Sequence, residues 1–183
     1  DFPEYRTEWD SIEYNIELRQ TETALRKVDS IFQLAKITNN EPQQIKALIY
    51  KTRLYSYKNE ESTIRAITEF STEMETAKAP MKQLLQSVRA ELYWKYYQQN
   101  RYQIQYRSTV QDFKQKDIRT WDAKKHFDEV SKGYLSSIKD IEQTKNISIN
   151  NYQAIIKGTD SRYAPSLYDF LAQRALFFFQ SNE

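Results

Sequence analysis

The sequence has no cysteine, and it has only one histidine and two glycines among its 183 residues. Without cysteine, the chain forms no disulfide bond, no zinc finger and no thiol nucleophile. Because glycine is scarce, turns that need a positive φ angle are scarce too, and folds rich in β-hairpins are not expected. No window approaches about 18 consecutive apolar residues, so the sequence predicts no membrane-spanning segment.

Charge of one sign is not concentrated in this chain. It contains 27 Lys and Arg residues against 25 Asp and Glu residues, a formal net charge of +2. The two signs are interspersed along every predicted helix, as on a solvated surface. Domains that bind nucleic acid usually gather positive charge on one face and have a high pI. We therefore expect no nucleic-acid partner.

Aromatic residues and good helix formers are abundant, and they meet in residues 84–106, LLQSVRAELYWKYYQQNRYQIQY. At about 100° per residue, this stretch is one long helix with apolar side chains on two sides. One stripe contains Leu84, Leu85, Val88, Leu92 and Tyr96, and Trp94 and Tyr97 lie well away from it. A helix that is apolar on two sides is usually packed between neighbours on both sides. The stretch therefore predicts a layered array of helices.

The rest of the chain supports the same fold class. The expected helices cover residues 4–19, 21–40, 60–77 and 80–106, with others starting at Pro42, at an N-cap Thr120, and at Pro165. Residues 108–119 and 140–151 are connectors, and residues 152–157 form a short helical turn that ends at Gly158. Short links between sequential helices predict antiparallel packing.

The predicted fold is therefore a single all-α domain, residues 1–183, with six to seven antiparallel helices. A tetratricopeptide-like right-handed solenoid of helical pairs or an irregular bundle both fit. The 34-residue tetratricopeptide period is only weakly matched, because Pro42 comes too late. On the last two helices we expect one inward face each: Phe127, Val130, Tyr134, Leu135 and Ile138 on the first, Leu167, Phe170, Leu171, Ala175 and Leu176 on the second.

The single histidine, His126, has Asp122 one turn before it and Glu129 three residues after it. This spacing suits a metal ligand set or an acid–base pair. Its position at the edge of the solvent side predicts instead a surface histidine beside a capping aspartate. The glycine-containing loop 158–161 lacks the P-loop pattern. We therefore expect no catalytic residue, no metal site and no cofactor.

The aromatic side chains of residues 93–106 have two interpretations. They either fill the layer between adjacent helices or line a groove that binds a peptide or a partner helix. Packing is the favoured interpretation. If a groove exists, Trp94, Tyr97 and Tyr50 are the candidate protein-binding residues.

Four segments carry a resemblance to a known family: residues 46–50 (KALIY), 90–101 (AELYWKYYQQNR), 120–122 (TWD) and 163–172 (YAPSLYDFLA). In their order and over most of the chain, these segments resemble the N-terminal helical region of the large bacterial alpha-2-macroglobulin-like proteins. Members of that family are exported proteins thought to trap proteases through a bait segment, sometimes with a Cys-Leu-Glu-Gln thioester. This chain has no cysteine and is predicted to be helical, so it holds neither the thioester nor the β-sandwich domains of such proteins.

The resemblance implies that residues 1–183 are the N-terminal part of a much larger exported protein, in the periplasm or at the cell surface. It transfers no functional residue to this chain. We expect a non-catalytic helical interaction or spacer module that contacts other domains of its parent or another protein. The alternative is a stand-alone tetratricopeptide-like domain that binds a peptide or protein.

Overall fold

The computed structural model describes residues 3–56, 61–106, 117–156 and 162–181. Within these ranges it has seven α-helices and no β-strand, which confirms the predicted all-α class. The α-helices are α1 (Pro3–Glu17), α2 (Thr21–Ile37), α3 (Glu41–Tyr55), α4 (Ser62–Thr76), α5 (Met81–Gln105), α6 (Ala123–Ile138) and α7 (Leu167–Gln180). Three short 3-10 helices accompany them: η1 (Ile118–Thr120), η2 (Ile141–Gln143) and η3 (Ile149–Tyr152).

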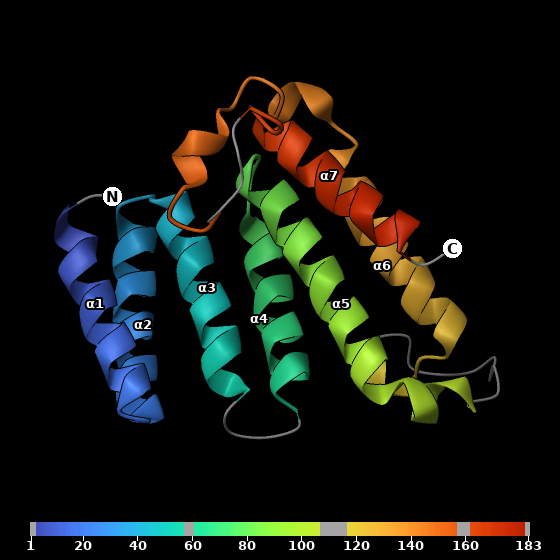
Figure 1. Ribbon diagram of the computed structural model, residues 1–183, viewed down its shortest axis with the longest axis horizontal. Helices are drawn as coiled ribbons and strands as arrows, with labels where there is room; N and C mark the ends of the chain where they lie inside the picture. Colours follow the sequence, from blue (N-terminus) through green and yellow to red (C-terminus); the bar gives the residue numbers. More distant parts are fainter. Residues whose placement is uncertain (1–2, 57–60, 107–116, 157–161, 182–183) are drawn as a thin grey trace.

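Figure 1 shows the helices from α1 to α5 following one another in a row, with α7 in front of α6 at its far end. Consecutive helices pack against each other, and alternate helices also make contact. The ring of Trp9 on α1 lies 4.5 Å from that of Tyr50 on α3. On α2, Lys36 forms an ion pair with Glu73 of α4 at 2.9 Å. The chain therefore forms an array of helices in which α5 lies between α4 on one side and α6 and α7 on the other, as residues 84–106 predicted.

The first two links are short and alike. Arg19 and Asn39, which follow α1 and α2, have φ angles of 58° and 51°. The next residue in each link donates its backbone N–H to a carbonyl five residues back, Gln20 to Asn15 and Asn40 to Ala35, both at 2.8 Å. This is the geometry of a Schellman motif, in which a left-handed residue ends a helix. Arg19 and Asn39 thus adopt the positive φ angles that glycine usually supplies at the end of a helix.

Side-chain caps fix where α6 and α7 begin. The carboxylate of Asp122 accepts the backbone N–H of Lys125 at 2.7 Å, and α7 starts with a capping box between Ser166 and Asp169. The predicted N-cap at Thr120 is therefore wrong. Thr120 belongs to η1, where its hydroxyl donates to the Asp117 carbonyl at 2.7 Å, and the helix starts at Ala123.

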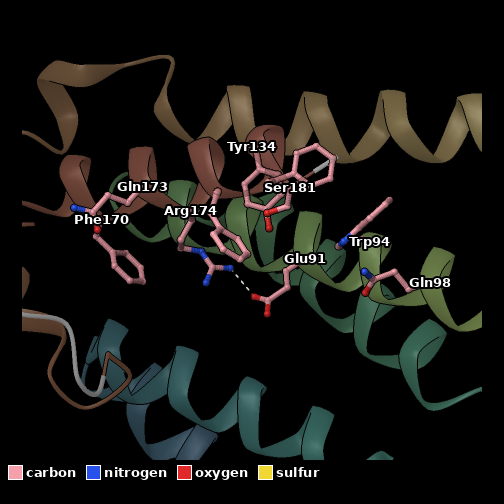
Figure 2. A pocket seen from close by; sticks show the side chains of 10 residues that line it. Glu91, Trp94, Gln98, Tyr134, Phe170, Gln173, Arg174 and Ser181 are labelled. Atoms are coloured by element: carbon pink, nitrogen blue, oxygen red, sulfur yellow. Dashed lines mark hydrogen bonds and ion pairs between the residues drawn. The ribbon is translucent and has the colours of Figure 1, made fainter. Parts of the chain in front are cut away.

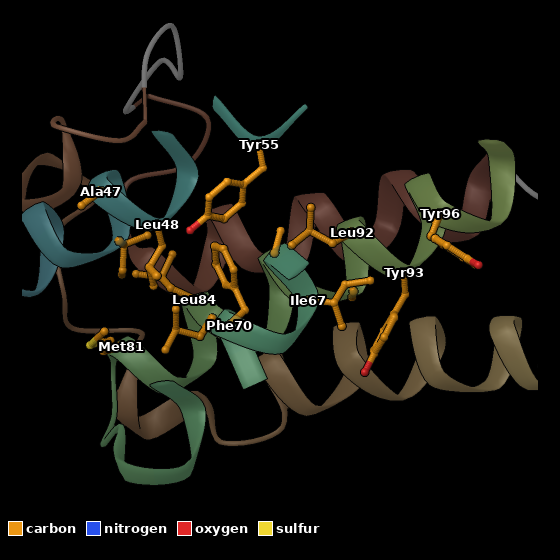
Figure 3. Close-up of a cluster of buried hydrophobic side chains, with 14 of the residues drawn as sticks. Ala47, Leu48, Tyr55, Ile67, Phe70, Met81, Leu84, Leu92, Tyr93 and Tyr96 are labelled. Atoms are coloured by element: carbon orange, nitrogen blue, oxygen red, sulfur yellow. The ribbon is translucent and has the colours of Figure 1, made fainter. Parts of the chain in front are cut away.

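The core runs through the whole array as one cluster of apolar side chains. Figure 3 shows its middle, where Leu48 of α3, Phe70 of α4 and Leu84 of α5 meet. Two residues expected to face inward are exposed, Leu135 by 53% and Leu176 by 55%. The other expected residues Val130 and Tyr134 on α6, and Leu167, Leu171 and Ala175 on α7, are buried, so each predicted face is correct in part.

The connection between α6 and α7 folds back over the first half of the molecule (Figure 1). Its base is closed by two backbone hydrogen bonds, Leu167 N–H to Ile147 at 2.8 Å and Ile149 N–H to Pro165 at 3.1 Å. Further along, the buried Tyr152 lies 3.5 Å from the Glu41 carboxylate at the start of α3. This return brings Tyr152, Ile155 and Ile156 beside α3. Lys157 and Gly158, where a helical turn was predicted to end, lie outside the described residues.

Candidate functional site

The three aromatic residues predicted to bind protein lie in different surroundings. Tyr97 is buried, and its ring is stacked on Trp94 at 5.1 Å. Trp94 is half-buried between the rings of Phe127 and Phe178. Tyr50 packs against α1, where burial and a hydrogen bond to Glu13 raise the pKa of its hydroxyl. Trp94 and Tyr97 both contact Phe127 of α6, whereas Tyr50 contacts α1, and Trp94 lines one of the two cavities described below.

His126 is fully buried, so its predicted surface position is wrong. Its ring lies 5.3 Å from Trp121, 5.8 Å from Tyr96 and 5.7 Å from Tyr97. The predicted capping role of Asp122 is confirmed. In the part of the chain that the structure describes, no group of three His, Asp or Glu residues could hold a metal ion. His126 is therefore part of the packing between α5 and α6.

A first cavity, the α3–α5 pocket, has a volume of about 360 Å³. Its walls come from three helices and from the connection that folds back over α3. Its lining residues are Ile45, Ile49, Thr52, Arg53, Ser56, Leu84, Ser87, Val88, Glu91, Leu92, Lys95, Ile155, Ile156, Phe170 and Arg174. Seven of these fifteen residues are aliphatic, and the charged ones are Arg53, Lys95, Arg174 and Glu91. Such a cavity suits an apolar side chain with polar groups beside it.

A second cavity, the α5–α7 pocket, has a volume of about 590 Å³ and lies beside the first. Aromatic side chains dominate this lining, which consists of Glu91, Trp94, Gln98, Tyr134, Phe170, Gln173, Arg174, Phe177, Phe178 and Ser181. Phe177 is 73% exposed, which is unusual for a phenylalanine. Figure 2 shows Trp94 and Gln98 following Glu91 along α5, opposite Gln173 and Arg174 of α7.

One ion pair separates the two pockets. Arg174 reaches from α7 to α5, where its Nη2 donates to Glu91 at 2.6 Å and its Nε donates to Ser87 at 2.8 Å (Figure 2). Arg174 and Glu91 line both cavities, and their side chains are 25% and 57% exposed. The two pockets therefore adjoin at this ion pair, and together they are called the front groove below.

The sequence contained a partial signal for this groove. Ile155 and Ile156 are adjacent apolar residues in a polar connection, and such a pair marks a segment that docks on the rest of the fold. The Arg174–Glu91 pair had no signal, because the partners lie 83 positions apart. Among the described residues, no helix is both long and apolar enough to cross a membrane.

Comparisons with known proteins place no further constraint on this site. No protein-family model, curated protein or solved structure matched the chain.

Proposed function

We propose that this chain is a non-catalytic helical interaction module and that its front groove receives an extended segment of a partner polypeptide. The observation that carries the proposal is the pair of adjoining cavities of about 360 and 590 Å³ along α5. Both have apolar floors and polar groups at their rims. Grooves of this type bind a peptide through apolar side chains that enter pockets and polar groups that fix its position.

The length of the groove suits a short extended segment. From Leu84 to Gln98, α5 rises about 21 Å, the length of about six extended residues. Successive side chains of an extended segment point to opposite sides. Single apolar side chains on one side of such a segment can therefore enter the two cavities of about 360 and 590 Å³ in turn.

The resemblance to bacterial alpha-2-macroglobulin-like proteins suggests which kind of parent protein contains the module. On that basis we propose that it belongs to an exported protease-trapping protein in the periplasm or at the cell surface. There it would join or space domains of its parent. The array of helices equally suits a stand-alone tetratricopeptide-like domain, and the front groove would then bind a separate protein.

A peptide-selection experiment tests the groove. Random heptapeptides displayed on phage are selected on the immobilised 183-residue chain, and enriched peptides are synthesised and measured by fluorescence anisotropy. Ile49, which is 36% exposed in the α3–α5 pocket, is changed to Asn. Leu34, which is 43% exposed on α2, is changed to Asn as the matched control.

We expect Ile49→Asn to weaken binding about tenfold, because the polar amide replaces an apolar contact in the pocket. Leu34→Asn should bind as the unaltered chain does. Circular dichroism spectra verify that both variants keep their helices. Failure to enrich any peptide, or equal binding by Ile49→Asn, would refute the proposed role of the groove.

A further inference from the structure

We infer that the segment bound in the front groove is acidic, with Asp or Glu side chains alternating with aliphatic ones. This inference depends on the proposed function, because it specifies the ligand of the same groove. It comes from the charges around the two pockets. The described lining contains three cations, Arg53, Lys95 and Arg174, and one anion, Glu91.

The imbalance is local to the groove. The whole chain of 183 residues carries a formal net charge of only +2, and the lining of this small depression carries the same excess. Complementary charge at the rim of a groove speeds association and selects the partner. An acidic segment therefore gains most at a cation of this rim that no neighbouring carboxylate neutralises, and a basic segment gains only at Glu91.

The three cations differ in how far a neighbouring carboxylate already neutralises their charge. Arg174 is held by Glu91 at 2.6 Å and by Ser87. Arg53 has a longer contact, 3.4 Å, to Glu13. Lys95 is exposed and has no ion pair with a described residue. Lys95 is therefore the first site for a ligand carboxylate, and a second carboxylate competes with Glu91 for Arg174.

The order of groups along α5 sets the pattern of the ligand. Leu84, Val88 and Leu92 are spaced one turn apart in the α3–α5 pocket, and Glu91 and Lys95 are spaced one turn apart at its rim. An extended chain points successive side chains to opposite sides. Alternation of aliphatic and acidic residues therefore places one set in the pocket and the other at the rim.

The test uses three amidated, N-acetylated hexapeptides, which carry no terminal charge. The first alternates Leu or Ile with Glu, the second has Gln in place of Glu, and the third has Lys. Fluorescence anisotropy of labelled peptides measures their affinity for the full chain at low and at high salt. Variants Lys95→Glu and Glu91→Gln are compared with Lys132→Glu, which reverses an exposed lysine on α6 outside the groove.

We expect the Glu peptide to bind about tenfold more tightly than the Gln peptide, and the Lys peptide to bind least. High salt should reduce this preference. Lys95→Glu should weaken binding of the Glu peptide about tenfold, Glu91→Gln should tighten it, and Lys132→Glu should leave it unchanged.

Three other outcomes separate the two proposals. Equal binding of the Glu and Gln peptides, lost in Ile49→Asn, would overturn the acidic ligand and leave the groove as a peptide site. An equal loss in Lys95→Glu and Lys132→Glu would also overturn it, since the attraction would then belong to the whole surface. No binding by any peptide, together with failed selection from the random library, would overturn the proposed function itself.

Discussion

Helix α5 packs against α6 and against α7 in different ways. Toward α6 the contact is closed: a Cβ added to Gly133 would lie 2.8 Å from the Cβ of Ala90. The ring of Tyr93 packs on Trp121 at 5.2 Å, and His126 is fully buried beside them. Small residues thus let the two backbones approach, and aromatic rings fill the remaining space.

Toward α7 the contact is open. A long side chain, Arg174, crosses from α7 to Ser87 and Glu91, and a cavity lies on each side of it. Charged side chains of this length hold helices apart because their heads must keep polar partners. The comparison indicates that packing is tight at the α5–α6 contact and incomplete at the α5–α7 contact, where the proposed binding groove lies.

Removal of the buried His126 ring from the α5–α6 contact should have the largest effect on stability. His126→Ala leaves a cavity among Trp121, Tyr96 and Tyr97, and we expect the free energy of unfolding to fall by about 2–4 kcal/mol. Urea denaturation followed by circular dichroism measures the change. Lys124→Ala, at an exposed position of the same helix, serves as the control. A loss as small as that of the control would mean that the ring adds little to the α5–α6 contact.

A smaller loss is expected from closing the gap at Gly133. An alanine there would gain helix propensity, yet its Cβ would meet Ala90, and we expect a net destabilisation of about 1–2 kcal/mol. The double variant Gly133→Ala/Ala90→Gly should be more stable than the sum of the two single changes predicts, because it restores the clearance. Additive effects in this double-mutant cycle would show that the helices do not need the close approach.

Loss of the Arg174–Glu91 ion pair at the α5–α7 contact should reduce the stability of the fold less than the changes at the α5–α6 contact. Arg174→Met keeps an apolar stem and removes both hydrogen bonds, and its exposed ion pair is worth about 1 kcal/mol or less. Thermal and urea unfolding should therefore shift little, in contrast to the changes at His126 and Gly133. A loss as large as that of His126→Ala would mean that the α5–α7 contact supports the fold in the same way as the α5–α6 contact.

The fold was predictable from local patterns because each helix carries its own signals. Residues 84–106 are apolar on two sides, and α5 does lie between neighbours; Pro42 lies in the first turn of α3, as expected. The orientation of α6 was not predictable in the same way. Its buried stripe contains His126, Gly133 and Ser137, which hydrophobic periodicity does not count as core. The close approach to Ala90 decides this orientation, and that approach involves a residue on another helix.

The groove was predicted only at Trp94, for a related reason. Its lining joins residues of α3 and α5 with Ile155, Ile156 and Arg174, which meet only after the chain has folded back. The pair of Ser87 and Arg174 spans 87 positions. Periodicity describes one helix at a time, so it assigns side chains to faces and does not show which faces stay open.

The smallest expected effect concerns two tyrosines, one at each contact. Burial raises the pKa of Tyr93 at the closed contact and of Tyr134 at the open one. Unfolded tyrosine ionises near pH 10. Because the folded pKa is higher, both hydroxyls contribute stability that is complete below about pH 10 and is lost as the pH rises further. Other tyrosines with raised pKa values add the same loss to every variant and cancel in the comparison.

The open contact should change this pH dependence because it holds the cation that faces Tyr134. Arg174 lowers the pKa of Tyr134 against the effects of burial and of Glu91. Arg174→Met should therefore raise that pKa further and steepen the loss of stability between pH 9 and pH 11. Urea unfolding at both values measures this slope, and Arg174→Met/Tyr134→Phe should return it toward that of Tyr134→Phe. If the double variant keeps the steeper slope, the effect of Arg174 passes through another group, and Tyr134 does not sense the bridge.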